Sequence, residues 1–411
     1  MRFPDGLRAL NHRDYRFYFV GLLVSMIGTW MQSVGQAWLI VELTDSAFLL
    51  GLISALHFTP TLVLALFGGA LADRLPKRKV LMVTQASMMV LAFSLSALVW
   101  SGHVQYWHVA LMAFLLGCIN TIDVPVRQAF TVEMVGGKHD LGNAVALNSA
   151  IFNGARLVGP AAAGLLIGKY GVALAFFLNG ASFLAILGAL WAIRADGLPR
   201  PRAKQSIVGD VTEGLQYAYR TPLIAFLLTL LFAIALFVIN YQVLVPVLAK
   251  NVLQVDASGY GYLMSSLGAG ALTGAFILAF RKRGEPRLAP LVTAALVLCA
   301  ATASMFFVRS FGLACIGLFV MGVSQILFTA DTNTTVQMVV PDELRGRVMS
   351  LYQLMFAGTV PFGSLFTGAV IERWGGSAGF LVGGLLGLLL ALLLLGFWLR
   401  ARSRSPRAMS A

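Results

Sequence analysis

Apolar residues fall into twelve long runs separated by short polar segments. Each run has about the 20 mostly apolar residues that an α-helix needs to cross a bilayer. The runs cover 16–41, 47–72, 80–100, 106–127, 143–168, 172–194, 222–249, 258–280, 288–308, 311–334, 348–371 and 377–399. The pattern predicts an all-α integral membrane protein with twelve transmembrane helices.

One polar stretch, 195–221, is longer than the others and divides six runs from six. Within it, Ile207, Val211 and Leu215 recur at helical spacing and predict a short amphipathic helix over 206–220 at the cytoplasmic surface. The predicted organisation is an N-terminal six-helix bundle, a cytoplasmic linker, a C-terminal six-helix bundle and a disordered basic tail, at 1–194, 195–221, 222–400 and 401–411.

Composition and charge support the same class. Apolar residues make up 58% of the chain and charged ones 11%, against about 25% charged residues in soluble domains. The net charge of +13 does not indicate nucleic-acid binding, because with a cytoplasmic N-terminus 25 of the 30 Lys and Arg fall on the cytoplasmic side. This positive-inside bias predicts that both termini are cytoplasmic.

The two halves of the chain are related. A shift of 204 positions aligns residues of the fifth and sixth runs with residues of the eleventh and twelfth, including Gly164 with Gly368 and Gly171 with Gly375. Parallel repeats of this size are typical of transporters in which two bundles move around a site near the membrane midplane.

The loop between the second and third runs reads G-G-A-L-A-D-R-L-P-K-R-K over 68–79. It resembles the signature loop of the major facilitator superfamily. Its conformational motif residues are Gly69, Asp73, Arg74, Lys77 and Arg78.

Asp73 stands at a helix C-terminus, where the helix dipole disfavours negative charge. The resemblance implies that its partner is the start of the eleventh helix at 346–348, flanked by Arg345 and Arg347. Pro76 departs from the superfamily pattern, which has glycine there. The alternative is a plain basic loop on the cytoplasmic side.

The fifth run contains G-A-R-L-V-G-P-A-A-A-G over 154–164, with motif residues Gly154, Arg156, Gly159, Pro160 and Gly164. It resembles the Gly-Pro motif of drug:proton antiporters. With T-D-S at 44–46, V-P-V-R-Q-A at 124–129 and P-D-E-L-R-G-R-V at 341–348, the chain resembles the bacterial drug-efflux family that includes the macrolide and enterobactin exporters. That resemblance implies the major facilitator fold and the bacterial inner membrane.

Arg156 falls midway along the fifth run, where an arginine costs about 2.5–3.5 kcal/mol. It is expected to face a watery cavity or an anionic partner, the alternative being a buried structural pair. Polar residues in the first, fifth, seventh and tenth runs are candidates for lining a cavity or, equally, for bonding helices together. They are Gln32, Gln36, Asn148, Asn153, Asn240 and Gln325.

Three acids are candidates for proton coupling: Asp123, Asp331 and, with less weight, Glu42. The competing interpretation pairs Asp123 with Arg127 and places Asp331 against the 341–347 loop. No nucleotide-binding loop, metal-binding motif or nucleophile elbow occurs.

The sequence therefore predicts a secondary transporter for proton-coupled efflux of small amphipathic compounds, drugs or siderophore-like metabolites, by alternating access. We expect a monomer that uses no cofactor or metal and whose partners are a small-molecule substrate, protons and the bilayer. Uptake or lipid flipping on the same fold is the alternative. A membrane-embedded enzyme is disfavoured because the sequence shows no catalytic cluster.

Overall fold

The computed structural model describes residues 3–137, 139–195, 197, 207–281 and 288–404, without the side chains of 65–74, 207–211 and 401–404. In this part of the chain, twelve helical spans are long and apolar enough to cross a membrane. The predicted number of transmembrane helices is therefore confirmed.

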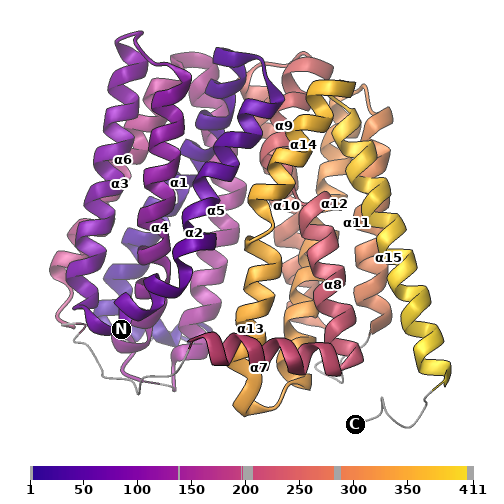
Figure 1. Cartoon of the computed structure of the whole chain (residues 1–411). Helices are drawn as coiled ribbons and strands as arrows, with labels where there is room; N and C mark the ends of the chain where they lie inside the picture. Colours follow the sequence, from indigo (N-terminus) through magenta and orange to yellow (C-terminus); the bar gives the residue numbers. More distant parts are fainter. Residues whose placement is uncertain (1–2, 138, 196, 198–206, 282–287, 405–411) are drawn as a thin grey trace. The chain divides into compact units, whose positions relative to one another are not determined.

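The chain forms two compact units. The first unit contains Met1–Asp45, Leu56–Ala203 and Val255–Gly268. Its helices, drawn from indigo to magenta in Figure 1, are η1 (Asp5–Asn11), α1 (Arg13–Thr44), α3 (Lys77–Trp100), α4 (Tyr106–Met134), α5 (Leu141–Tyr170) and α6 (Val172–Ala192), together with most of α2 (Ala47–Arg74).

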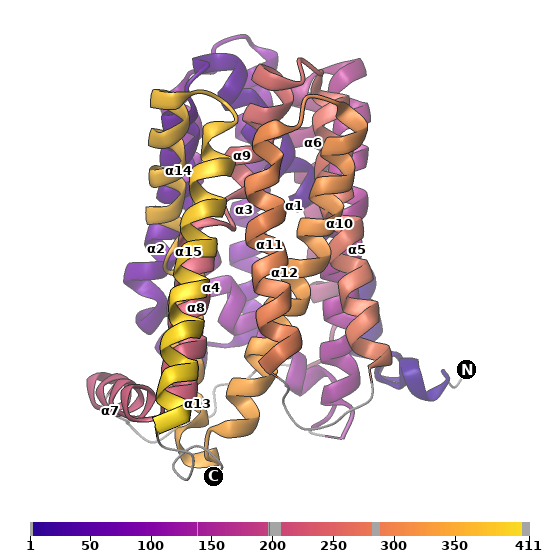
Figure 2. The same ribbon diagram turned by 90° about the vertical axis from the view of Figure 1, so that its right-hand side faces the viewer.

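The second unit contains Ser46–Ala55, Lys204–Gln254 and Ala269–Ala411. Its helices are α7 (Ile207–Arg220), α8 (Pro222–Phe237), α9 (Tyr241–Val247), η2 (Leu248–Val252), α11 (Leu288–Ser304), η3 (Met305–Phe307), α12 (Phe311–Val339), α13 (Asp342–Ala357), α14 (Val360–Trp374) and α15 (Ala378–Arg404), with the later part of α10 (Ala257–Phe280). In Figure 2, α11 runs beside α12 and α15.

Two helices are divided between the units. The first turns of α2 belong to the second unit and the rest of α2 to the first, with the change at residues 55 and 56. Conversely, α10 begins in the first unit and continues in the second, with the change at 268 and 269. Each unit thus includes a short segment from the other half of the sequence.

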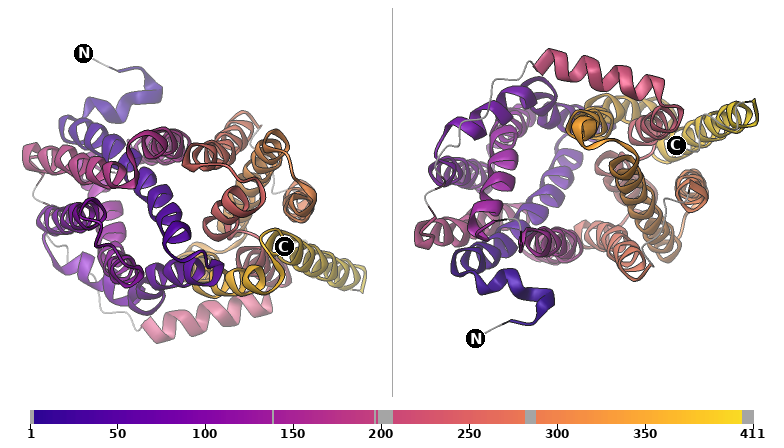
Figure 3. Two further views of the ribbon diagram at one scale, coloured as in Figure 1. Left: turned by 90° about the horizontal axis from the view of Figure 1, so that it is seen from above. Right: turned by 90° about the horizontal axis from the view of Figure 1, so that it is seen from below.

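The core of the first unit lies among α1, α3, α4, α5 and α6, whose helices are seen end-on in Figure 3. Large side chains from four of these helices are fully or almost fully buried there, among them Tyr15, Leu81, Phe130 and Leu190. α1 and α6 approach closely at Gly21, because a Cβ there would lie only 2.9 Å from the Ala185 carbonyl oxygen. Small residues of this kind let membrane helices pack closely.

Two runs that the sequence predicts as continuous helices are broken. The 222–249 run is interrupted between α8 and α9, where the Asn240 side-chain amide donates to the Leu236 carbonyl at 2.8 Å. The 348–371 run is interrupted between α13 and α14, with Pro361 in the first turn of α14. Proline has no N–H and fits the start of a helix better than its middle, whereas hydropathy alone does not register either break.

The repeat seen in the sequence has a structural counterpart. α5 is followed by Gly171 with φ 82°, and α14 is followed by Gly375 with φ 96°. A positive φ favours glycine because it has no Cβ. Just before each glycine a cation lies near the following aromatic ring, with Lys169 5.1 Å from Tyr170 and Arg373 5.8 Å from Trp374.

The helix predicted over 206–220 is α7. It packs against α8 and α13 and runs across them (Figure 1). Arg347 of α13 and Glu213 of α7 form an ion pair at 2.5 Å, which ties α7 to the second unit.

Candidate functional site

The Gly-Pro motif of α5 is a packing surface on which α1 and the start of α10 lie, all within the first unit. Gly159 accommodates Trp30, since a Cβ at Gly159 would lie 2.5 Å from the Cβ of Trp30. Pro160 has no N–H to donate to the carbonyl of Arg156 four residues earlier. That carbonyl faces Gly268 of α10, where an added Cβ would lie 2.6 Å from it.

The start of α10 presents one stripe of small residues to α5, namely Ser258, Gly261, Ser265 and Gly268. The Ser258 hydroxyl donates to the Gly164 carbonyl at 3.1 Å and the Ser265 hydroxyl donates to the Leu157 carbonyl at 3.0 Å. A Cβ at Gly261 would lie 2.5 Å from the Pro160 carbonyl oxygen. The motif therefore supports a close, neutral contact between two helices.

Arg156 is half-buried on α5, and its guanidinium lies over the ring of Trp30. Its guanidinium carbon lies 5.9 Å from the centre of the Trp30 ring, and the Trp30 and Phe152 rings meet edge to face at 5.6 Å. Such a cation–π contact is worth about 0.5–2 kcal/mol, depending on solvation. Gly154, in the same motif, has open space around it, because nothing lies within 4 Å of an added Cβ.

The loop motif is anchored to the first unit through its basic residues. Lys77 forms an ion pair with Glu133 of α4 at 2.9 Å. Arg78 donates to the carbonyls of Leu190 and Trp191 of α6, both at 2.7 Å.

The other motif residues, Gly69, Asp73 and Arg74, lie on α2, and their side chains are outside the described part of the structure. The predicted contact of Asp73 with the eleventh helix stays a prediction.

Asp123 is fully buried in a polar cluster of the first unit. It pairs with Arg127 one turn along α4 and accepts hydrogen bonds from the Thr84 hydroxyl at 2.7 Å and the Gln85 amide at 2.8 Å, both of α3. These donors fix the carboxylate toward α3. The pairing of Asp123 with Arg127, one of the two interpretations open from sequence, is present.

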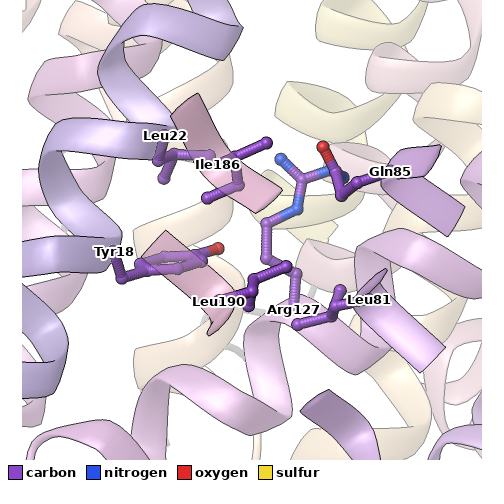
Figure 4. A pocket seen from close by; sticks show the side chains of 7 residues that line it. All are labelled: Tyr18, Leu22, Leu81, Gln85, Arg127, Ile186 and Leu190. Carbon is purple, nitrogen blue, oxygen red and sulfur yellow. The ribbon is translucent and has the colours of Figure 1, made fainter. Parts of the chain in front are cut away.

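A small pocket opens beside this cluster, lined by Tyr18, Leu22, Leu81, Gln85, Arg127, Ile186 and Leu190 (Figure 4). The Tyr18 hydroxyl and the Arg127 Nε are buried, and neither has a hydrogen-bond partner among the described residues. The cavity, of about 10 Å³, is close to the smallest that holds one water.

The other two candidate acids lie in more accessible places. Asp331 of α12 pairs with Arg281 at 2.8 Å, with 20% of its side chain exposed. The alternative interpretation, which places Asp331 against the 341–347 loop, stays a prediction; within that range Arg345 binds Asp342 at 2.5 Å. Glu42 is exposed on α1 and accepts a hydrogen bond from the Trp38 indole at 2.6 Å.

Four of the six candidate cavity-lining residues hold specific hydrogen bonds. Gln32 is buried and accepts from the Asn179 amide at 2.6 Å. Asn148 accepts from the Tyr15 hydroxyl at 3.0 Å. Asn153 and Asn240 each donate to the carbonyl four residues earlier, at 2.9 Å and 2.8 Å.

The remaining two candidates are Gln36, which is half-buried, and Gln325, which is buried. For Gln32 and Asn148 the bonds link helices, as expected of interhelical polar groups.

One acid escaped the sequence analysis. Glu372 lies in the last turn of α14 and contacts the start of α2 in the second unit. The 204-residue repeat offered a signal, because the position equivalent to Glu372 in the first half is Gly168. An acid in the second half at a position where the first half has glycine, near a helix C-terminus, marks a difference between the two halves.

Outside the membrane spans, one described carboxyl group, that of Asp140, has a clearly shifted pKa. Asp140 precedes α5 and binds His12 at 2.8 Å and Arg8 at 2.8 Å. The hydrogen bond with His12 holds the pKa of Asp140 below its usual range. Among the described residues, no group of three or more His, Cys, Asp or Glu is placed to hold a metal ion.

Comparison with known proteins places these features in a family. The profile of the transmembrane secretion effector family matches residues 5–409. The multidrug efflux pump Tap of Mycolicibacterium fortuitum is 26% identical over 91% of this chain and 92% of its own length. The staphyloferrin A transporter of Staphylococcus aureus is 24% identical over 88% and 90% of the two chains. The enterobactin exporter EntS of Escherichia coli is 24% identical over 83% and 81%.

A solved structure shows the same fold. The crystal structure of a bacterial homologue of the human lysosomal transporter Spinster matches with a TM-score of 0.71 at 14% identity, over 95% of this chain and 96% of that one. At this identity the likeness concerns the fold and not the substrate.

Proposed function

Because the chain belongs to the transmembrane secretion effector family of the major facilitator superfamily, we propose that it is a secondary active exporter. In this proposal it moves small amphipathic compounds, drugs or siderophore-like metabolites, out of the cell in exchange for protons. The proposed direction, export, is supported by the similarity of this chain, over most of both chains, to an efflux pump and to a siderophore exporter. Transport across a membrane by a multi-pass protein is common to all these relatives.

Alternating access is the mechanism that the fold supports best. The two units include reciprocal segments, the start of α2 in one and the start of α10 in the other. In the proposed cycle the bundles 1–194 and 222–400 rock about these crossing helices while the 195–221 linker joins them. Both termini are cytoplasmic in this proposal, and the working form is a monomer.

Proton coupling is assigned by how each acid is held. Asp123 has three donors and no exposed surface, so losing its negative charge would leave Arg127 buried without a counter-charge. Asp331 pairs with Arg281 and has a partly exposed side chain. We therefore assign the proton-carrying role to Asp331 and a structural role to Asp123.

Purified protein in liposomes tests the function directly. With an imposed pH gradient, we expect gradient-driven movement of a lipophilic dye that an uncoupler abolishes. Asp331→Asn is expected to lose gradient-driven transport while dye exchange without a gradient persists. Asp123→Asn is expected to lower the melting temperature as well, because one partner of a buried ion pair is removed.

Three results would each contradict part of the proposal. If the uncoupler does not change dye movement by the wild-type protein, the proposal that transport is coupled to protons is wrong. Accumulation of the dye in cells that make the protein, relative to cells that do not, would favour uptake over export. If Asp331→Asn retains wild-type gradient-driven rates, the proton is carried elsewhere.

A further inference from the structure

Glu372 occupies an unfavourable position on its own helix. It lies in the last turn of α14, which ends at Trp374, and the carbonyl end of a helix repels negative charge. Its neighbour Arg373 is the residue type expected there, and that side chain lies near the Trp374 ring. The placement of Glu372 therefore calls for an explanation outside α14.

The explanation is the start of α2. One oxygen of Glu372 accepts hydrogen bonds from the Ala47 backbone N–H at 3.0 Å, the Phe48 backbone N–H at 3.4 Å and the Ser46 hydroxyl at 3.1 Å. Ser46 in turn accepts from the Leu49 backbone N–H at 3.2 Å. The first N–H groups of a helix have no partner within the helix, and here Glu372 and Ser46 satisfy those of residues 47 to 49.

The contact extends along both helices within the second unit. Beside the Glu372 contact, a Cβ at Gly368 would lie 2.7 Å from the Ala47 carbonyl, and Gly51 lies against the Ser364 carbonyl. As the residue number rises on α14 it falls on α2, so the two helices are antiparallel. Glu372 stands at the end of this contact, on the first turn of α2.

We propose that Glu372 is a latch that holds the start of α2 on α14, and that its release is a step in the transport cycle. This rests on the proposed function, because α2 belongs to both units and movement between them must act on its first turns. The resemblance of the 68–79 loop implies that Asp73, at the other end of α2, meets the start of the eleventh helix. In that case α2 and the eleventh span would be joined by one carboxylate at each end of α2, Glu372 at its start and Asp73 at its end. Each contact would hold one of the two facing states of the transport cycle.

Two matched positions can report the state of the latch. Ala47 is the first residue of α2 and 5% exposed, and Ala257 is the first residue of α10 and 4% exposed. Each is replaced by cysteine in a background in which Cys118, Cys299 and Cys315 are alanine. The rate of labelling by a membrane-impermeant maleimide then measures how often each helix start becomes accessible.

Glu372→Gln removes the charge and keeps the side-chain size. We expect it to raise labelling at both reporters about fivefold, a factor of the size that a lost charged cap produces in a two-state equilibrium. Arg373→Gln, in the same turn of α14, is the matched control and is expected to change neither rate. Glu372→Asp keeps the charge with a shorter reach and should give an intermediate rate.

A response at position 47 alone would show that Glu372 only caps α2 locally, and the latch would be refuted. Unchanged labelling at both positions would refute it as well. If Glu372→Gln does not accumulate in the membrane, the intermediate Asp variant decides in the same way. Labelling needs no substrate, so failure of wild-type protein to export the dye would count against the proposed function and leave the latch standing.

Discussion

The two helices that pass between the units, α2 and α10, are held by different chemistry at equivalent places. α10 lies on α5 through glycine contacts and two serine hydroxyls that donate to carbonyls. α2 lies on α14 through glycine contacts and the carboxylate of Glu372. A duplicated architecture thus has one contact bridged by neutral hydroxyls and one bridged by a carboxylate, here called the neutral contact and the charged contact.

The repeat shows where the halves diverged. Position 372 is Glu and its equivalent is Gly168, against which Ser258 of α10 packs. Asp256 instead caps its own helix by accepting from the Gly259 N–H at 3.0 Å. Halfway along, Arg156 on α5 has Val360 as its equivalent. Each half therefore carries an ionised side chain on this surface where the other has a neutral residue.

The largest effect is expected at Arg156, the charge that only the first half carries. Arg156→Leu should abolish transport at wild-type abundance, and Arg156→Lys should impair it, because a compact ammonium does not reproduce the shape and hydrogen-bonding fork of the guanidinium that lies over Trp30. Val360→Ala, at the equivalent position, is the control. Loss of the Arg156→Leu protein from the membrane would instead indicate a structural pair.

The next largest effect is expected from a bulky side chain in the contact between α5 and α10. Gly261→Leu should lower transport more than tenfold and the stability by about 1–3 kcal/mol, because the added side chain meets the Pro160 carbonyl and separates α10 from α5. Gly154→Ala, where an added methyl meets nothing within 4 Å, should be silent. Thermal unfolding and dye transport measure both, and a tolerant Gly261 would mean that this contact is not needed.

The charge can be moved from one contact to the other. Gly168→Glu alone puts a second carboxylate beside Asp256, and we expect transport to fall about fivefold from like-charge repulsion and crowding of Ser258. Gly168→Glu with Asp256→Ser copies the arrangement at the start of α2 and should recover part of the loss. A double variant worse than the single one would show that the two contacts are not interchangeable.

A smaller effect is expected from the serines. Ser258→Ala with Ser265→Ala removes two bonds worth about 0.6 kcal/mol each, so stability should fall by about 1 kcal/mol and transport by no more than about threefold. The loss should be the same across the working pH range, since neither hydroxyl titrates there. A loss that grows with acidity would contradict a neutral contact.

The smallest effect is expected at Asp140, outside the spans. Its pKa is lowered in the folded protein, so its bonds stabilise the fold above the ordinary carboxyl pKa of about 4 and are lost as the pH falls through the lower folded value. Asp140→Asn should therefore leave the pH profile of transport unchanged between about pH 5 and 8. A shifted profile would mean that Asp140 takes part in the pH dependence of transport.

Hydropathy was sufficient to predict the twelve spans, because each needs an apolar run of bilayer length. It missed the breaks between α8 and α9 and between α13 and α14, because the runs stay mostly apolar while the helix stops. Hydropathy also does not predict which side chains bond to one another. Gln32 reads as a cavity residue until Asn179, 147 positions away, is seen to bond it. Glu372 was missed as well: the repeat marks its position by aligning it with Gly168, but its partners, the Ser46 hydroxyl and two backbone N–H groups, lie 324 to 326 positions away along the chain.

Trp30, which packs against Gly159, can serve as an intrinsic fluorescence probe of this region. An indole ring under a guanidinium should have its emission perturbed by the cation above it, and Arg156 supplies that cation at 5.9 Å. Compounds or variants that displace Arg156 should change the emission of this one tryptophan among seven. A chain in which the other six are replaced by phenylalanine would report occupancy of this region in real time, without any attached dye.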